Sequence, residues 1–403
     1  MGTHIYFLNA KWLSIWATLS VLITVNTASA ERNARFLFDD VKLNTTELAA
    51  KYGYKVEEHK VTTEDGYVLT IHHIPGKGRP ILMIHALADS TESWFTRGEI
   101  SLGVTLADLG HDLWMGDCRG NAYSRNHVKL DPDKDAEAFW DFSFHEHGYY
   151  DLPAFIDTVL EKTGEKKLNA IGISQGTAMF FIMGSLRPEY NEKVNALVAM
   201  APVAYLNHLE PPLSTFIKIA PQLYAAATKL GLYEVLGNTP SGKIIKSICL
   251  KPLIGYFICA FGVLFPIAGF DIEEYGPVFH YKAMKRFPQS SSSKNFYHFA
   301  QVSRRRSFSQ YDYGPSENLE IYGSDMPPDY DLSKVTMPIV LLCGQNDKFS
   351  PLEDVATLRV QLPNVVEYTV LERSKMNHLD FVWGKNMDKY LYPELFKAMD
   401  KFF

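Results

Sequence analysis

Short apolar runs alternate along the chain with longer stretches of helical periodicity, and turn-forming residues separate them. This alternation is typical of a mainly parallel sheet with helices on both faces. We therefore predict an α/β fold. The clearest predicted strands are PILMIHA (80–86), DLWMGD (112–117), LNAIGI (168–173), ALVAMAP (196–202), PIVLLCG (338–344) and EYTVLE (367–372).

Two regions depart from this alternation of strands and helices. Residues 55–75 alternate in polarity on either side of Asp65-Gly66, which predicts an antiparallel hairpin. Residues 205–334 are far too long for an ordinary strand connection. We therefore predict a core formed by 31–204 and 335–403, with 205–334 as an inserted, mainly helical cap or lid.

The predicted cap is rich in proline and in aromatic and apolar residues. We expect its apolar runs at 221–236 and 248–270 to form helices whose inner face covers an apolar ligand. A purely structural core would give the same pattern. A membrane span at 248–270 is a further alternative, which Lys251, two prolines and several glycines oppose. We expect exposed loops at SSSSKNF (290–296) and SRRRS (303–307).

The first thirty residues differ in composition from the rest. Lys11 is their only formal charge, an apolar stretch follows it, and Ala28-Ser29-Ala30 fits a cleavage site. We predict a signal peptide at 1–30, with an uncleaved anchor as the alternative. Entry into the secretory pathway makes Asn44-Thr45-Thr46 a candidate glycosylation site, although the same residues would also suit an unmodified turn.

Composition and charge narrow the class of protein. The chain has 403 residues, of which 46% are hydrophobic and 21% charged, which excludes disordered and fibrous proteins. Its net charge of −6 gives no sign of nucleic-acid binding. Cys249 and Cys259 are close enough in sequence to close a small loop by a disulfide, whereas Cys118 and Cys343 are expected to be buried thiols. We predict neither a metal site nor a cofactor.

The predicted strand 168–173 leads directly into Gly172-Ile173-Ser174-Gln175-Gly176, and a helical stretch follows. This G-x-S-x-G pattern, between a strand and a helix, is typical of a nucleophile elbow. Small residues two positions before and after the serine let neighbouring backbone approach closely. Ser174 is therefore the candidate nucleophile.

A serine nucleophile requires a base and an acid that orients the base, in the chain order Ser, Asp, His. Asp347 follows the strand 338–344, and His378 lies between the last strand and the final helix. Asp380 is the weaker alternative to Asp347, because it lies only two residues from His378. The oxyanion is expected to bind the backbone N–H groups of Gln175 and Leu87.

Several motifs resemble those of the acid lipase family of α/β-hydrolases, which includes gastric and lysosomal acid lipases. They are TEDGYVL, DLWMGDCRGNAYSRNH, FWDFSFHEHGYYDLPAFID, GISQGT, YDYG, PPDYDLSKV and NHLDFVWG. The resemblance covers nearly the whole chain after the signal peptide. It implies a serine hydrolase acting on triacylglycerols or cholesteryl esters beneath a lid, without a cofactor. By position it places the triad on Ser174, Asp347 and His378, and the oxyanion donors on Leu87 and Gln175.

The chain departs from the family pattern at a few positions. Ala86 stands where the family has glycine, Ile173 where it has histidine, and His145 where it has an acidic residue. A family cysteine is absent just before Gly269, so a Cys249–Cys259 pair would be a shifted version of the lid disulfide. These changes leave the predicted chemistry intact but bear on substrate range and rate.

The interpretation that best fits these features is a secreted or lysosomal serine lipase that acts on neutral lipid. Its expected partners are a lipid ester and, through the cap, a lipid–water interface, with no nucleic acid and no membrane span after signal cleavage. Two alternatives stay open. One is an esterase for short, soluble esters with a divergent lid, and the other is a lipid-binding protein that keeps the fold without turnover.

Overall fold

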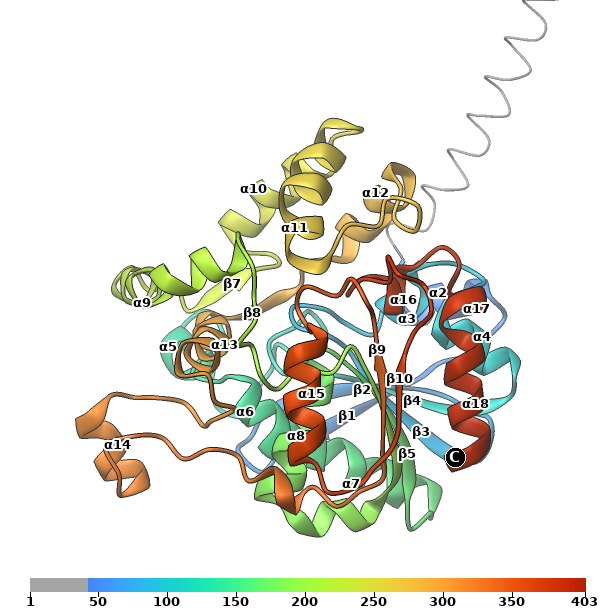
Figure 1. Cartoon of the computed structure of the whole chain (residues 1–403), viewed down its shortest axis with the longest axis horizontal. Helices are drawn as coiled ribbons and strands as arrows, with labels where there is room; N and C mark the ends of the chain where they lie inside the picture. Colours follow the sequence, from blue (N-terminus) through green and yellow to red (C-terminus); the bar gives the residue numbers. More distant parts are fainter. Residues whose placement is uncertain (1–42) are drawn as a thin grey trace, which may run out of the picture. The chain divides into compact units, whose positions relative to one another are not determined.

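A computed structural model describes residues 43–403, so the expected signal peptide at 1–30 lies outside the described residues. Its centre is an eight-stranded sheet in the order β1-β2-β4-β3-β5-β6-β9-β10 (Figure 1). The strands are β1 (Glu57–Thr62), β2 (Val68–Ile74), β3 (Lys77–Ile84), β4 (His111–Asp117), β5 (Leu168–Ile173), β6 (Val194–Met200), β9 (Ile339–Cys343) and β10 (Val365–Val370).

The sheet is parallel from β4 to β10, and β2 runs antiparallel to both β1 and β4. The predicted hairpin is therefore confirmed, with Glu57 paired to His73 and Thr62 paired to Val68. β5 is buried along its whole length, which explains why its sequence is apolar on both faces. The α/β class and the six strands predicted from apolar runs are confirmed.

Helices cover the sheet, and α8 follows β5 directly. Nearly every residue of α8 is buried, so this helix is apolar all round rather than amphipathic. The helices outside 205–334 are α2 (Thr45–Lys51), α3 (Ser93–Thr96), α4 (Leu102–Asp108), α5 (Ala136–Phe139), α6 (Phe144–Glu146), η2 (His147–Asp151), α7 (Leu152–Thr163), α8 (Gln175–Leu186), η3 (Pro188–Lys193), α15 (Leu352–Gln361), α16 (Asp380–Trp383), α17 (Met387–Tyr390) and α18 (Tyr392–Phe402).

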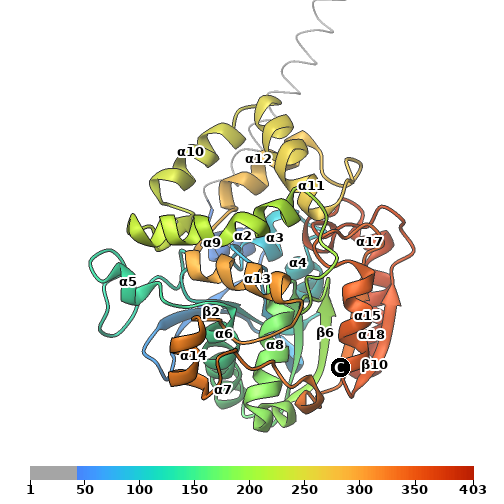
Figure 2. The same cartoon turned by 60° about the vertical axis from the view of Figure 1, so that its left-hand side comes forward.

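The chain between β6 and β9 includes residues 205–334, which we call the inserted segment. Figures 1 and 2 show its helices α9 to α12 gathered beyond one end of the sheet. Among residues 43–403, no helix is both long enough and apolar enough to span a bilayer. The elements of the segment are α9 (Leu213–Lys229), β7 (Glu234–Leu236), α10 (Pro240–Cys249), η4 (Tyr256–Leu264), α11 (Phe265–Ala268), α12 (Pro277–Arg286), β8 (Ser290–Ser292), α13 (Ser293–Arg305), α14 (Pro315–Tyr322) and η5 (Leu332–Lys334).

The expectation of an exposed loop at SSSSKNF is wrong. Ser290 to Asn295 are buried, with β8 pairing to β7 and α13 beginning at Ser293. The serines are polar, but burial is possible where a hydroxyl has partners within the protein. The hydroxyl of Ser292, for example, donates to the carbonyl of Trp140 and accepts from the N–H of Lys294. The expectation of a loop at SRRRS (303–307) is also wrong in part, because Ser303 to Arg305 form the last residues of α13 and Arg306 caps it. Arginines suit this negative end of the helix dipole.

Candidate active site

Ser174 lies at a sharp turn between β5 and α8. Its φ of +53° is in the region that residues with a Cβ rarely adopt. A Cβ on Gly176 would lie 2.6 Å from the carbonyl oxygen of Ile84, and one on Gly172 would lie 3.1 Å from the backbone of Gly176. Both glycines are therefore needed for the strand, the turn and the neighbouring loop to pack together. The turn places the serine at the start of α8, as the motif predicts.

The structure brings Ser174 and His378 together, although 204 residues separate them. The Oγ of Ser174 lies 2.8 Å from Nε2 of His378. On the other side of the ring, Nδ1 lies 2.8 and 3.0 Å from the two carboxylate oxygens of Asp347. The three side chains thus form one continuous chain of hydrogen bonds, in the arrangement that lets an imidazole take a proton from a hydroxyl.

Asp347 is fixed by its own loop. Its Oδ1 accepts the backbone N–H groups of Phe349 and Ser350, at 2.9 and 2.7 Å. The loop follows β9, so the carboxylate lies at the edge of the sheet where β5 also ends. These bonds hold the carboxylate toward His378 and leave Oδ2 for the imidazole.

Asp380, the weaker alternative, does not contact the imidazole in this way. Its carboxylate accepts the backbone N–H of Asn377 at 2.9 Å. Burial raises the pKa of Asp380 well above its usual range, and the nearby charges of Asp271 and Glu274 raise it further. A carboxyl in those surroundings resists ionisation, so it is unsuited to stabilising an imidazolium.

The two expected oxyanion donors lie on neighbouring loops. Gln175 is the first residue of α8, and Leu87 lies in the loop after β3, whose start at Ile84 and His85 passes against Gly176. Within residues 43–403, no acceptor of this chain receives the backbone N–H of Leu87 or of Gln175. Two such N–H groups are available to a developing negative charge.

The inserted segment forms hydrogen bonds to three of the loops that carry the candidate site, and no pattern in the sequence predicts these contacts. The carbonyl oxygen of Ala268 accepts the N–H of His378 at 3.0 Å, and the N–H of Gln289 donates to the carbonyl of Ala88 at 2.8 Å. The amide of Asn295 donates to Oε1 of Gln175 at 2.8 Å. The segment therefore holds the base, the loop after β3 and the residue that follows the nucleophile.

The side chain of Gln175 is held at both ends. While Oε1 accepts from Asn295, Nε2 donates to Nδ1 of His147 at 3.2 Å. Burial, together with the charge of Arg119, lowers the pKa of His147 to about 3, so its ring is neutral at ordinary pH and can accept. Asn295 lies in the run interpreted as an exposed loop. Its helical spacing with buried Phe299 and Val302 was the signal available in the sequence.

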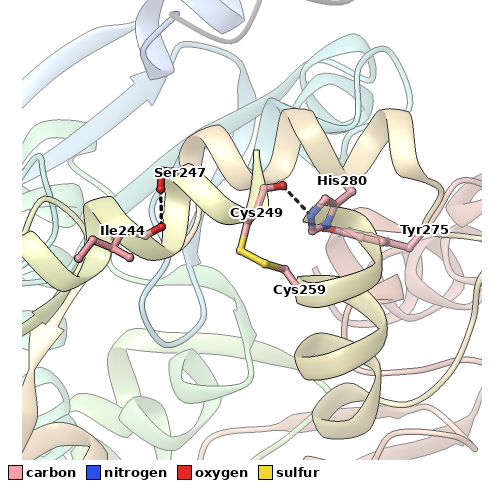
Figure 3. Close-up of a disulfide and its surroundings, with 6 residues drawn as sticks. All are labelled: Ile244, Ser247, Cys249, Cys259, Tyr275 and His280. Carbon is pink, nitrogen blue, oxygen red and sulfur yellow. Dashed lines mark hydrogen bonds between the residues drawn. A yellow bond between two sulfur atoms is a disulfide. The ribbon is translucent and has the colours of Figure 1, made fainter. Parts of the chain in front are cut away.

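The structure joins Cys249 to Cys259 through a disulfide, within the inserted segment (Figure 3). The carbonyl oxygen of Cys249 accepts from Nε2 of His280 at 3.2 Å, and Nδ1 of the same ring lies 3.1 Å from the hydroxyl of Tyr275. The disulfide thus joins α10 to η4, and the hydrogen bond from His280 holds α12 against them. Cys118 and Cys343 are buried free thiols, as expected.

The remaining residues singled out in the sequence lie apart from the triad. Asn44 is exposed at the start of α2, where Oδ1 accepts the N–H of Glu47 in a capping box. His145, on α6, places Nδ1 2.8 Å from the hydroxyl of Tyr330. Ile173 is buried at the end of β5, and Ala86 is half-buried after β3. No observation connects these last three residues to rate or substrate range.

Comparisons with known proteins identify the family to which the chain belongs. The model of the alpha/beta hydrolase fold matches residues 79–385, and that of a partial alpha/beta-hydrolase lipase region matches 45–98. Lipase 1 of Drosophila melanogaster is 36% identical, over 90% of this chain and 81% of the relative. Gastric triacylglycerol lipase of Mus musculus is 33% identical, over 94% of this chain and 99% of the relative.

A solved structure from Sulfolobus solfataricus aligns with a TM-score of 0.56 at 14% identity, covering 86% of this chain and 94% of that one. At that identity the likeness shows the fold alone, whereas the curated relatives and the family models also show the kind of enzyme. The chain is therefore a carboxylic ester hydrolase, and it belongs to the family of α/β-hydrolase lipases that includes the gastric triacylglycerol lipases.

Proposed function

We propose that the protein is a serine lipase of the secretory pathway that hydrolyses neutral lipid esters through an acyl-enzyme on Ser174. The observation that carries the proposal is the continuous set of hydrogen bonds from Ser174 through His378 to Asp347. The relatives of this protein include gastric triacylglycerol lipases. This likeness favours triacylglycerol or cholesteryl ester as the substrate over water-soluble esters.

Acylation begins when Nε2 of His378 takes the proton of the Ser174 hydroxyl. The Oγ then attacks the ester carbonyl carbon, and the carbonyl oxygen becomes an oxyanion that accepts the N–H groups of Leu87 and Gln175. Asp347 stabilises the imidazolium that forms. When the tetrahedral intermediate collapses, the C–O bond to the alcohol breaks, and His378 gives its proton to the departing alkoxide.

Deacylation repeats these steps with water. His378 takes a proton from a water molecule, whose oxygen attacks the acyl carbon of the ester on Ser174. The second oxyanion collapses, the fatty acid leaves, and the proton returns to the serine oxygen. No step requires a metal or a cofactor, and each proton is taken up and released by the same ring nitrogen.

Several features support a secretory route and a lid. Residues 1–30 have signal-peptide character, and a disulfide is typical of an oxidising compartment. Asn44 is exposed, and its hydrogen bonds use the backbone N–H and the side-chain oxygen, which is compatible with a glycan on the amide nitrogen. We assign residues 205–334 as the lid, because they hold the loops that carry the triad.

The test is hydrolysis by the purified mature chain, wild type beside Ser174→Ala. Three substrates are compared from acid to neutral pH: a short-chain ester, an emulsified long-chain triacylglycerol and a cholesteryl ester. Serine-dependent release of long-chain fatty acid supports the proposal. Turnover of the short ester alone would instead identify a carboxylesterase. No turnover, together with no labelling of Ser174 by a fluorophosphonate, would identify a lipid-binding protein.

A further inference from the structure

Two histidines and a glutamate converge on the outer hairpin of the sheet, at a place that the ester chemistry does not use. Glu57 and His59 lie two residues apart on β1, and His73 is the strand partner of Glu57 on β2. Residues two apart on a strand point to the same face, and directly paired residues share it. The hairpin register therefore brings the three side chains together.

The donor atoms of this cluster are close enough to share one ion. Oε2 of Glu57 lies 3.5 Å from Nδ1 of His73 and 3.7 Å from Nε2 of His59, and one atom from each residue lies within 4.8 Å of the others. Tetrahedral zinc, with ligands at about 2.0–2.1 Å, holds its donor atoms roughly 3.3 Å apart. The two distances from Oε2 of Glu57 need to shrink by only a few tenths of an ångström, and the two ring nitrogens, which lie within 4.8 Å of each other, must also approach one another.

Both ring nitrogens that face Glu57 lack a hydrogen-bond partner. Among the described residues, Nε2 of His59 and Nδ1 of His73 are buried atoms with no donor or acceptor. Buried polar atoms are rarely left so, and each such atom requires an explanation. Two such nitrogens directed at one carboxylate form a donor set that suits a bound cation.

The surroundings of His73 fix which nitrogen is free to bind. Its Nε2 lies 2.8 Å from Oδ1 of Asp112, a carboxylate that also accepts the N–H groups of Gly76 and Trp114. The neutral ring that binds a metal would therefore carry its proton on Nε2 and present the lone pair of Nδ1 to the ion. A carboxylate that orients a histidine in this way is the usual outer partner of a metal-bound imidazole. Trp114 also stacks on the ring at 3.8 Å, which holds it in place.

From this arrangement we infer a zinc site formed by Oε2 of Glu57, Nε2 of His59 and Nδ1 of His73, with water as the fourth ligand. Imidazole donors favour zinc and its transition-metal neighbours over calcium and magnesium, which prefer oxygen. The glutamate side chain is 43% exposed, which gives the ion a route from solvent.

The position of the site indicates a structural role. His73 pairs with Trp114 in the middle of β4, whereas Ser174 follows the end of β5, which is two strands further along the sheet. The two sites are therefore formed by different strands, and the zinc ligands all lie on the outer hairpin. A bound ion would join β1, which is an edge strand with one unpaired side, to β2. It would stabilise the hairpin without entering the ester chemistry.

The experiment is zinc titration of the chelator-treated mature chain, in competition with a chromophoric chelator. Glu57→Gln is compared with Glu58→Gln, which removes the same charge from the next residue, on the opposite face of β1, at nearly equal side-chain exposure of 43% and 44%. We expect one zinc per wild-type chain, with Kd unaffected by millimolar calcium. Glu57→Gln should raise Kd at least tenfold, and Glu58→Gln should leave it within threefold.

Thermal unfolding provides a second readout that does not depend on enzyme activity. Zinc should raise the Tm of the wild type and of Glu58→Gln but not that of Glu57→Gln. Asp112→Asn should weaken zinc binding roughly 10–100-fold, as expected for an outer partner of a ligand. Zinc binding that does not saturate at one per chain, or an equal effect of the two glutamate variants, would overturn the assignment.

Discussion

The sheet and the inserted segment both contain long apolar runs, but they use them differently. Every residue of β5 and β9 is buried, whereas α9 has no buried residue at all. Of the 21 large apolar side chains exposed among residues 43–403, 15 lie between Phe216 and Val278. An apolar surface of that extent indicates an interaction site. The apolar residues of the sheet stabilise the fold, whereas many of those in the segment face solvent.

The inner side of the segment behaves more like the sheet. Ala268, Gln289 and Asn295 each make a hydrogen bond to a loop of the candidate site. The segment therefore combines an outer surface suited to an apolar partner with an inner surface that holds the site in place. If this division is correct, substitutions in the loops at the edge of the sheet abolish hydrolysis. Substitutions in the segment instead change only the positioning of the site or the access of substrate to it.

The largest effect is expected at the carboxylate that orients the base. Asp347→Asn should keep the loop bonds but stabilise the imidazolium poorly, and kcat should fall about 10⁴-fold. Asp380→Asn is the matched control, because it removes a buried carboxyl two residues from His378 that bonds instead to Asn377. Its kcat should stay within a few-fold of the wild type. Equal losses in the two variants would contradict the assignment of Asp347.

The next effect concerns the outer surface of the segment. Ile254 and Phe257 are 60% and 59% exposed, so replacing both with serine removes apolar area without opening a cavity. Burying such a side chain in lipid is worth about 1.5–3 kcal/mol at most. We expect roughly 10–100-fold slower hydrolysis of emulsified triacylglycerol and no change with a soluble short-chain ester.

A control for this pair is available on α14, which lies away from α10 to α12 (Figures 1 and 2). Leu319 and Ile321 are 55% and 51% exposed, so their double serine variant removes a similar apolar area elsewhere. It should behave as the wild type on both substrates. If both double variants slow emulsion hydrolysis equally, the outer surface of α9 to η4 has no special role.

A smaller effect is expected on the inner side, at Asn295. Asn295→Ala leaves Oε1 of Gln175 without its donor, and one such bond is worth about 1 kcal/mol. Because Gln175 supplies a proposed oxyanion donor, kcat and the rate of fluorophosphonate labelling should fall about fivefold to tenfold, with KM little changed. Gln301→Ala is the control, since this buried amide on the same helix bonds to the backbone of Asp312. Gln301→Ala should lower the free energy of unfolding and leave kcat and the labelling rate unchanged.

The elements that sequence predicted best are those determined by local periodicity. The strands, the hairpin and the elbow follow from apolar runs and from glycines whose positions are fixed by close backbone contact, as at Gly176. The order Ser174, Asp347, His378 singled out one of 13 histidines, and the structure places its ring between Ser174 and Asp347, because each of the three follows a strand at the same edge of the sheet.

Contacts between distant segments were not predictable in this way. Asn295 and Gln175 are 120 residues apart, and a polar run of serines gives no sign of burial when its partners are backbone carbonyls elsewhere. The cluster of Glu57, His59 and His73 was missed for a related reason. Its residues become neighbours only through the hairpin register, and they match no sequence spacing typical of zinc sites.

The smallest expected effect is a pH dependence of the free energy of unfolding that arises from His280 in the inserted segment. Burial lowers the pKa of this histidine to about 4, below its ordinary value near 6.5. Between pH 6.5 and 4 the unfolded chain therefore binds more protons, so the free energy of unfolding must fall as pH falls through that window. His280→Gln removes the titrating ring. Below pH 6.5 it should reduce the slope of the free energy of unfolding against pH by about one proton, and above pH 6.5 the curves of variant and wild type should stay parallel. Denaturant unfolding at pH 8, 6.5, 5 and 4 measures both slopes. Parallel curves below pH 6.5 would mean that other groups, such as His147 beneath the site, control the response to acid.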